Sequence, residues 1–233
     1  MRRQTGFTLI EIALVLVILG LLLGGILKTQ ELITGARVRK LISQQEGMKV
    51  AFFGFEDRFR FPPGDYAQAT INISGIATSA ACGNGNGNGS RQIETTNNEM
   101  VLAWEHLSKA GFLAGTYTCA ASESNTTTPV NPYSVYVRLI FDGTYGFASG
   151  GAPRHNVKTG AQIPVDILAE VDRKIDDGAP YAGGFQFSSY QGNAAAAPTE
   201  SAPAAPACTN TNTTAAVWNA TNNSANCGGA SLL

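Results

Sequence analysis

Charged residues are scarce in this sequence of 233 residues, in which Asp, Glu, Lys and Arg together make up 14%. Soluble domains typically contain about 25%. The two signs nearly balance, with 16 basic and 17 acidic side chains. No field of one sign therefore points to nucleic acid or to an anionic membrane as a partner. The composition gives no clear nucleic-acid signal.

Residue types that bind metals or carry out catalysis are also few. The chain has two histidines, His106 and His155, and its four cysteines form no C-x-x-C pair. A zinc site therefore has little support. Neither G-x-S-x-G nor H-E-x-x-H occurs in the sequence, and both are common signatures of hydrolases. We predict that both histidines are surface or loop residues and that the protein is not an enzyme.

One long apolar run is present instead, and it lies at the amino terminus. Residues 7–27 carry a single charge, that of Glu11, and follow the basic pair Arg2-Arg3. As a helix this run spans about 31 Å, which matches a hydrocarbon core of roughly 30 Å. The positive-inside rule places the two arginines in the cytoplasm. We therefore predict a single membrane pass, with everything after Lys28 on the far side.

Glu11 distinguishes this run from two simpler alternatives, a secretory signal peptide and an uncleaved signal anchor. A signal peptide has a shorter apolar region followed by a small-residue cleavage site. Neither alternative explains a carboxylate inside the apolar run, because an ionised one costs on the order of 2.5–3.5 kcal/mol at the membrane centre. Such a residue is by default a functional candidate that needs a partner.

The run Gly6-Phe7-Thr8-Leu9-Ile10-Glu11 resembles the processing signature of type IV prepilins and type II secretion pseudopilins. The resemblance covers the leader and the whole apolar helix. It implies that a prepilin peptidase cuts between Gly6 and Phe7 and methylates the new Phe7 amine. It also implies that Glu11, the fifth residue of the mature chain, pairs with the amine of a neighbouring subunit.

The same resemblance implies an α+β pilin fold, in which a long amino-terminal helix packs on a small antiparallel sheet. The implied function is that of a structural subunit of a type IV pilus-like filament. The subunit would start in the bacterial inner membrane with a periplasmic globular domain, and then join a filament at the cell surface. The implied partners are the prepilin peptidase, other pilin or pseudopilin subunits, the inner-membrane assembly platform and the membrane.

Two departures keep alternatives open. Many pilins carry a proline where this helix has Lys28, and the globular part matches no single major pilin. The alternatives are a pseudopilin or minor pilin of a type II secretion system, and a tip adhesin or DNA-uptake minor pilin. The last would use the carboxy-terminal loop as its contact surface.

The rest of the chain divides by composition and periodicity. An amphipathic stripe continues the first helix, and the Pro-Pro-Gly turn at 62–64 ends it. We predict five parts: a leader (1–6), a helix (7–61, with 7–27 in the membrane or filament core), a globular domain (62–190), an Ala/Pro linker (191–207) and a disulfide loop (208–233).

Within the globular part, the glycine-rich loop at residues 83–89 predicts a mobile segment rather than a phosphate loop, because no Lys-Ser/Thr follows it. Thr96 and Glu99 form a candidate capping box for a short helix. We further predict strands at 133–141 and 144–148 joined by Asp142-Gly143, a helix at 164–176 and a last strand at 184–190.

Four cysteines on an exported domain favour two disulfides. Three connectivities are possible, and nearest-neighbour pairing, Cys82–Cys119 with Cys208–Cys227, is the simplest. Near the end of the second predicted helix, Asp172, Asp176 and Asp177 cluster before a glycine. Carboxylates with turn carbonyls suit Ca²⁺, and some pseudopilins carry calcium in this general region. We expect no other cofactor.

Overall fold

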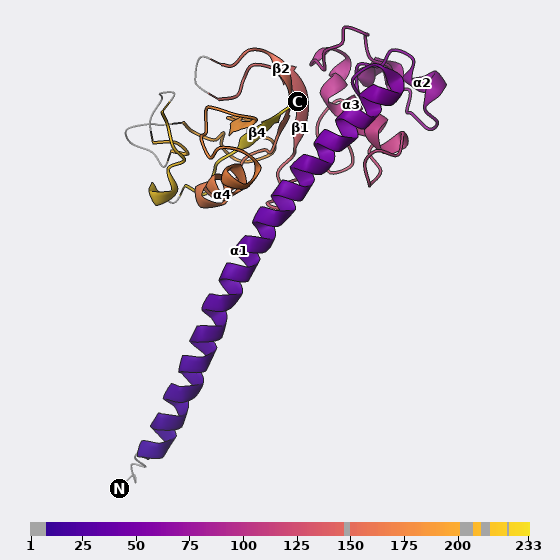
Figure 1. Ribbon diagram of the computed structural model, residues 1–233. Helices are drawn as coiled ribbons and strands as arrows, with labels where there is room; N and C mark the ends of the chain where they lie inside the picture. Colours follow the sequence, from indigo (N-terminus) through magenta and orange to yellow (C-terminus); the bar gives the residue numbers. More distant parts are fainter. Residues whose placement is uncertain (1–7, 147–149, 201–206, 211–214, 223) are drawn as a thin grey trace. The chain divides into compact units, whose positions relative to one another are not determined.

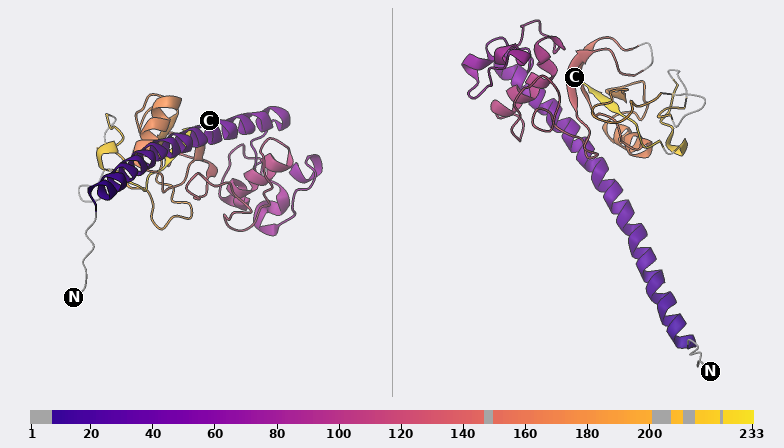
Figure 2. Two further views of the ribbon diagram at one scale, coloured as in Figure 1. Left: turned by 90° about the horizontal axis from the view of Figure 1, so that it is seen from below. Right: turned by 180° about the vertical axis from the view of Figure 1, so that it is seen from behind.

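The computed structural model describes residues 8–146, 150–200, 207–210, 215–222 and 224–233 (Figure 1). The chain divides into two units, residues 1–37 and 38–233. Helix α1 (Leu9–Phe59) begins in the first unit and ends in the second, and it is unbroken in both views of Figure 2. The helix predicted at 7–61 is therefore present. It ends at Phe59, two residues before the predicted end at the Pro-Pro-Gly turn.

The first unit consists, as far as it is described, of one apolar helix. Thr8 begins it, because its hydroxyl accepts a hydrogen bond from the backbone N–H of Glu11 at 3.3 Å, which satisfies one of the free donors at a helix start. Among the described residues, α1 is the only helix long and apolar enough to cross a membrane. Just after the apolar run, Lys28 forms an exposed ion pair with Glu31.

In the second unit, α1 buries one stripe and leaves the opposite stripe in solvent. The buried side chains recur every three or four residues, which is the spacing of one helix face: Val38, Leu41, Gln45, Met48, Phe52 and Phe55. Phe52 and Phe55 lie in one core cluster with strand residues Leu139 and Val157. The helix therefore packs on the sheet through its aromatic side chains, as the sequence predicts.

The sheet has four antiparallel strands in the order β1-β2-β4-β3. Their bounds are β1 (Arg138–Asp142), β2 (Arg154–Lys158), β3 (Phe185–Phe187) and β4 (Gly229–Leu232). Leu139, Val157, Ser231 and Phe185 are register partners in a single row across all four strands. The α+β class with a long helix on a small antiparallel sheet is therefore confirmed.

The chain end differs most from the predicted organisation. The sequence sets residues 208–233 apart as a loop, but β4 lies between β2 and β3 and pairs with both. The predicted linker also contributes to the core, since Ala194 is buried with Val135 and Ala161. The carboxy-terminal segment therefore completes the sheet and is not an appendage.

The predicted hairpin at Asp142-Gly143 is wrong, because β1 pairs with β2 and residues 144–146 are not in a strand. The rest of the predicted strand at 144–148 lies outside the described residues. Asp142 does not sit in a two-residue turn. Its carboxylate instead accepts hydrogen bonds from the Lys158 ammonium (2.6 Å) and the Asn156 amide (3.0 Å). Because these bonds tie the Asp142 side chain to β2, Asp142 and Gly143 do not form the tight turn that an Asp-Gly pair favours.

Helix α3 (Glu99–Lys109), the short helix that the sequence predicts, is buried on nearly all sides. The capping box predicted at Thr96 and Glu99 does not form. The N-cap is Asn98, in a left-handed conformation, and Thr96–Asn98 form a short 3-10 turn, η2. The remaining short helices are α2 (Ala69–Asn72), η1 (Ala80–Gly85), α4 (Val165–Ile175) and η3 (Ala220–Asn222).

In the loops that cover α3, buried carboxylates accept the backbone hydrogen bonds that a helix or a strand would otherwise accept. Asp65 accepts hydrogen bonds from the backbone N–H groups of residues 89–91, at 2.6–3.0 Å. Glu99 accepts from the N–H groups of Asn88 and Glu94, at 2.9 and 3.1 Å. Burial raises the pKa of both acids, that of Glu99 to about 7. Since buried N–H groups need acceptors, these acids hold the glycine-rich loop on a defined path.

Neither histidine is an exposed surface or loop residue, so the prediction of such positions is wrong: His106 belongs to α3 and the half-buried His155 belongs to β2. His106 is fully buried, and its Nδ1 accepts the Gly64 N–H at 3.0 Å while Nε2 lies 3.1 Å from the carbonyl of Gly85. His155 lies in β2 against the Phe52 and Phe141 rings. Burial lowers the pKa of each histidine to about 4, so both are neutral packing residues.

A matched pair of glycine substitutions tests the fixed path of the glycine-rich loop. A Cβ on Gly87 would collide with the backbone of Asp65, whereas a Cβ on Gly47 in α1 would meet nothing within 4 Å. We expect Gly87→Ala to lower the free energy of unfolding by about 1–3 kcal/mol. Gly47→Ala should raise it by about 0.5–1 kcal/mol through helix propensity. Urea unfolding of the full chain in detergent measures both. Equal stability of the two variants would contradict a fixed loop.

Candidate functional site

Glu11 is the only charged residue between Thr8 and Ile26, and it lies exposed in the first turn of α1. Its carboxylate makes no hydrogen bond or ion pair with any residue that the structure describes. The position suits an acid, because backbone N–H groups at a helix start carry partial positive charge. The predicted processing residues Gly6 and Phe7 lie outside the described residues.

The apolar side chains around Glu11 have no cover within their own unit. All are exposed: Leu9, Ile10, Ile12, Leu14, Val15, Leu16, Val17, Ile18, Leu19, Leu21, Leu22, Leu23 and Ile26. Burying one such side chain contributes about 1.5–3 kcal/mol. A helix exposed on this scale needs a bilayer or a set of apolar helices around it. Chemically, the segment is a membrane and assembly element that carries one carboxylate.

The four cysteines form two disulfides, Cys82–Cys119 and Cys208–Cys227, which are the nearest-neighbour pairs. The first joins Cys82, the residue directly before the glycine-rich loop, to the segment after α3, and both of its cysteines are buried with Val101 and Leu102. The second closes the carboxy-terminal loop beside β4. Both disulfides stabilise parts of the second unit that contain little regular secondary structure.

The acidic cluster at the end of α4 is brought together as its spacing suggests. One carboxylate oxygen from each of Asp172, Asp176 and Asp177 lies within 4.8 Å of the others. Asp176 Oδ2 accepts the backbone N–H groups of Gly184 and Phe185, and Asp177 Oδ1 accepts that of Ala179 at 2.8 Å. These bonds use a single oxygen of each acid.

Asp172 is the member with the most constrained environment. It is fully buried, and its Oδ2 accepts a 2.6 Å hydrogen bond from the indole N–H of Trp218. Its Oδ1 is buried and makes no hydrogen bond of normal geometry, although the N–H of Gly178 is near enough to lower the carboxyl pKa. Desolvation dominates and raises the pKa of Asp172 to about 6, and the charges of Asp177 and Asp176 add to the rise.

The free oxygens of this cluster fit a hard cation. Ca²⁺ takes oxygen ligands, including carboxylates and backbone carbonyls. A buried carboxylate oxygen without a partner, such as Asp172 Oδ1, costs free energy of folding, and a bound cation would offset that cost. Trp218 is the member that the sequence does not reveal. The signal that could have found it is that Trp218 is the only aromatic residue in the Thr/Asn-rich sequence from Cys208 to Cys227.

Comparison with known proteins identifies the amino-terminal segment. Residues 1–27 match the family model described as the prokaryotic N-terminal methylation motif. The chain therefore carries the signature of type IV prepilins and pseudopilins, and this motif indicates a pilin-like structural subunit that a prepilin peptidase processes. No curated protein and no solved structure matches the chain.

The raised pKa of Asp172 predicts a specific pH dependence of stability. Because its folded pKa of about 6 exceeds the ordinary value of 3.8, the ionised form opposes folding above pH 6 and this cost disappears towards pH 4. In EDTA, we expect Asp172→Asn to raise the free energy of unfolding at pH 8 by on the order of 3 kcal/mol at most. The gain should vanish at pH 4.

Urea unfolding of the full chain at both pH values checks this, with Glu170→Gln as the control, because Glu170 lies on α4 outside the cluster and forms an exposed ion pair with Lys174. The control should change stability little at either pH. An Asp172→Asn variant that loses stability equally at pH 4 and pH 8 would contradict the prediction, because it would show that the ionised carboxylate supports the fold.

Proposed function

We propose that the protein is a structural subunit of a type IV pilus-like filament, cut between Gly6 and Phe7 and polymerised through α1. The observation that carries this proposal is Glu11, a lone unpartnered carboxylate within an exposed apolar helix that follows the processing motif. A simple membrane anchor has no use for a charge there, because the charge weakens insertion.

The helix start itself does not account for Glu11. Thr8 already accepts the Glu11 backbone N–H through its hydroxyl, and no bond from the Glu11 carboxylate to its own helix occurs in the described part of the chain. Cleavage before Phe7 creates an amine, which is positively charged at neutral pH. When apolar helices bundle, the pairing of this amine with Glu11 of a neighbour compensates both charges in a medium of low dielectric constant and sets the axial register.

The steps follow from the charge pattern. The precursor inserts with Arg2 and Arg3 in the cytoplasm and the second unit in the periplasm. The peptidase removes residues 1–6, and the assembly platform of the inner membrane transfers the helix from lipid into a bundle of other pilin or pseudopilin helices. The apolar side chains of Leu9–Ile26 stay buried throughout, first by lipid and then by protein, so the transfer costs little hydrophobic free energy.

Two alternatives use the same processing chemistry. A type II secretion pseudopilin or minor pilin would share every step but form a short assembly, and the abundance of the subunit in sheared filaments separates it from a major pilin. A tip adhesin or DNA-uptake pilin would present the Cys208–Cys227 loop. Trp218, the aromatic residue of that loop, is buried against α4, so no described feature favours this alternative.

Mass spectrometry of the amino-terminal peptide from a membrane or filament fraction tests the proposal. We expect the peptide to start at Phe7 and to be heavier by one methyl group. An intact Met1 terminus in cells with an active peptidase would reject processing, and it would reduce the protein to a signal-anchored domain.

A Glu11→Gln variant separates assembly from processing. The amide keeps the size of the side chain but removes its charge, so we expect normal cleavage at Phe7 and at least a tenfold loss of subunit from sheared filaments. Glu31→Gln is the matched control, because Glu31 lies in the same helix and pairs with its own Lys28. Wild-type filament yield from the Glu11 variant would exclude the register role.

We also propose that Asp172, Asp176 and Asp177 hold Ca²⁺, a second role supported by the buried unpaired Oδ1 of Asp172. The ion would supply positive charge at the end of α4, where three carboxylates otherwise repel one another. Asp172 joins this cluster to Trp218, and Asp176 joins it to the start of β3. Bound calcium would therefore stabilise the junction of α4, β3 and the carboxy-terminal loop.

Thermal unfolding with calcium and with EDTA tests this second role. At a calcium concentration 100 times the dissociation constant, a single site adds about 2.7 kcal/mol, which raises the midpoint by about 5–10 °C. Asp172→Asn should abolish the shift. Glu170→Gln is the control, because Glu170 is on α4 but pairs with Lys174. An identical midpoint in calcium and EDTA for the wild-type chain would reject the site.

A further inference from the structure

A buried ion pair joins β1 to β2. Its members are Asp142, at the end of β1, and Lys158, at the end of β2, with 2.6 Å between Oδ2 and Nζ. Val157 packs in the core with Phe52 of α1, so the side chain of the next residue, Lys158, points to the other face of the sheet. The Lys158 side chain is only 4% exposed. An ion pair removed from water in this way needs further hydrogen-bond partners to offset its desolvation.

The two oxygens of the Asp142 carboxylate have different partners. Oδ1 accepts the side-chain N–H of Asn156 at 3.0 Å and the backbone N–H of Thr144 at 3.2 Å. Oδ2 accepts the Lys158 ammonium and, at 2.7 Å, the hydroxyl of Thr144. That hydroxyl in turn accepts a hydrogen bond from Lys158 Nζ. Two N–H donors on one oxygen are the arrangement of an oxyanion hole, and the hydroxyl connects the amine to the other oxygen.

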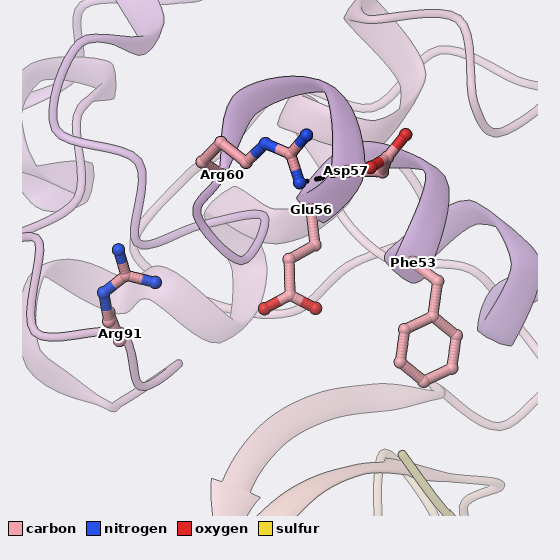
Figure 3. Close-up of a pocket in the computed structure, with 5 residues that line it drawn as sticks. All are labelled: Phe53, Glu56, Asp57, Arg60 and Arg91. Carbon is pink, nitrogen blue, oxygen red and sulfur yellow. Dashed lines mark ion pairs between the residues drawn. The ribbon is translucent and has the colours of Figure 1, made fainter.

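A short distance between lysine and acid does not by itself produce this arrangement. Lys174 and Glu170 are also 2.6 Å apart, but both side chains are about half exposed, so water competes for each charge. Arg60 and Asp57, which line the surface cavity of Figure 3, are 3.3 Å apart and mostly exposed. The pair of Lys158 with Asp142 instead combines contact with burial and with two donors on the oxygen that faces away from the amine.

We propose that Lys158 and Asp142 condense to an amide that links β2 covalently to β1. A proton passes from Nζ to Oδ2, and the neutral amine attacks Cγ while Oδ1 takes the negative charge between its two N–H donors. A second Nζ proton reaches Oδ2 through the Thr144 hydroxyl. Oδ2 then leaves as water as the Cγ–Oδ1 double bond re-forms, and the third Nζ proton stays on the amide. The step uses no other reactant.

The surroundings of the pair support this reaction. Desolvation lowers the pKa of Lys158, which makes the neutral amine easier to form. Desolvation would raise the pKa of Asp142, but the hydrogen bond and charge of Lys158 outweigh it and lower that pKa, so the ion pair is the state from which the reaction starts. Contact between the reacting groups within one chain supplies a high effective concentration. The exposed Thr144 gives the released water a path to solvent.

Mass spectrometry of the purified full chain, with both disulfides reduced, tests for the amide without any assay of filaments. We expect the wild-type chain to be lighter by one water molecule. Lys158→Arg keeps the positive charge but has no amine for this bond, so it should have its full mass. Lys174→Arg is the matched control and should lose water as the wild type does. A wild-type chain of full mass would overturn the proposal.

Tryptic digestion locates the bond. An amide on Lys158 prevents cleavage after that residue, so residues 139–154 should appear joined to residues 155–173 in one branched peptide. If the water loss maps within residues 139–154 alone, the carboxyl of Asp142 has closed on the backbone nitrogen of Gly143, and the proposal is wrong.

Two substitutions of Thr144 test the proton relay. Thr144→Ser keeps the hydroxyl and should form the branched peptide as the wild type does. Thr144→Val keeps the shape of the side chain without the hydroxyl, and it should lower the linked fraction at a fixed time after synthesis by about tenfold or more. Both disulfides should form in both variants, which shows that the fold is kept. Equal linked fractions in the two variants would exclude the proposed relay.

Discussion

Every feature of this protein depends on a helix of 51 residues that has two kinds of surface. Its first part is apolar on all sides and finds no cover within its own unit. Its later part buries one stripe, including Phe52 and Phe55, against the sheet. The same element thus serves as the centre of a folded core and as a surface that needs lipid or other helices.

The second unit compensates for its small sheet with buried ionic and polar groups. Strands of three to five residues cannot order the long connections around α3. Asp65 and Glu99 do so by accepting backbone hydrogen bonds, and Glu105 acts similarly on the N–H groups of Ala77 and Cys119, both at 2.7 Å. Burial keeps the pKa of Glu99 near 7 and those of the histidines near 4. On acidification, an acid whose pKa is raised in the folded state adds stability, and a histidine whose pKa is lowered removes it. The two effects on the free energy of unfolding therefore partly cancel.

Local signals predicted the parts of the fold that depend on periodicity or on a single motif. The 3.6-residue pattern located α1 and α4, and the nearest-neighbour pairing of cysteines, the simplest of three open connectivities, is the one that forms. The sequence failed where long-range pairing decides the outcome. β4 reads as Gly-Ala-Ser-Leu, too short and too small to signal a strand, and only the gap between β2 and β3 makes it one. The hairpin predicted at Asp142-Gly143 is wrong because Lys158 and Asn156 of β2 donate hydrogen bonds to the Asp142 carboxylate.

The candidate sites show the same division. Glu11 was evident because one charge in an apolar run is conspicuous without any structure. The acidic cluster was visible as spacing in one helix turn, but Trp218 and the orphaned oxygen of Asp172 depend on a contact across 46 residues of chain.

The position of β4 governs when the domain can fold. The backbone N–H of Leu233 bonds to the carbonyl of His155 at 3.0 Å, and β4 joins β2 to β3. In a chain that is made from the amino terminus, β4 is synthesised after both of its neighbours in the sheet. The core row from Val157 of β2 to Phe185 of β3 therefore stays unjoined until the residues of β4 are available.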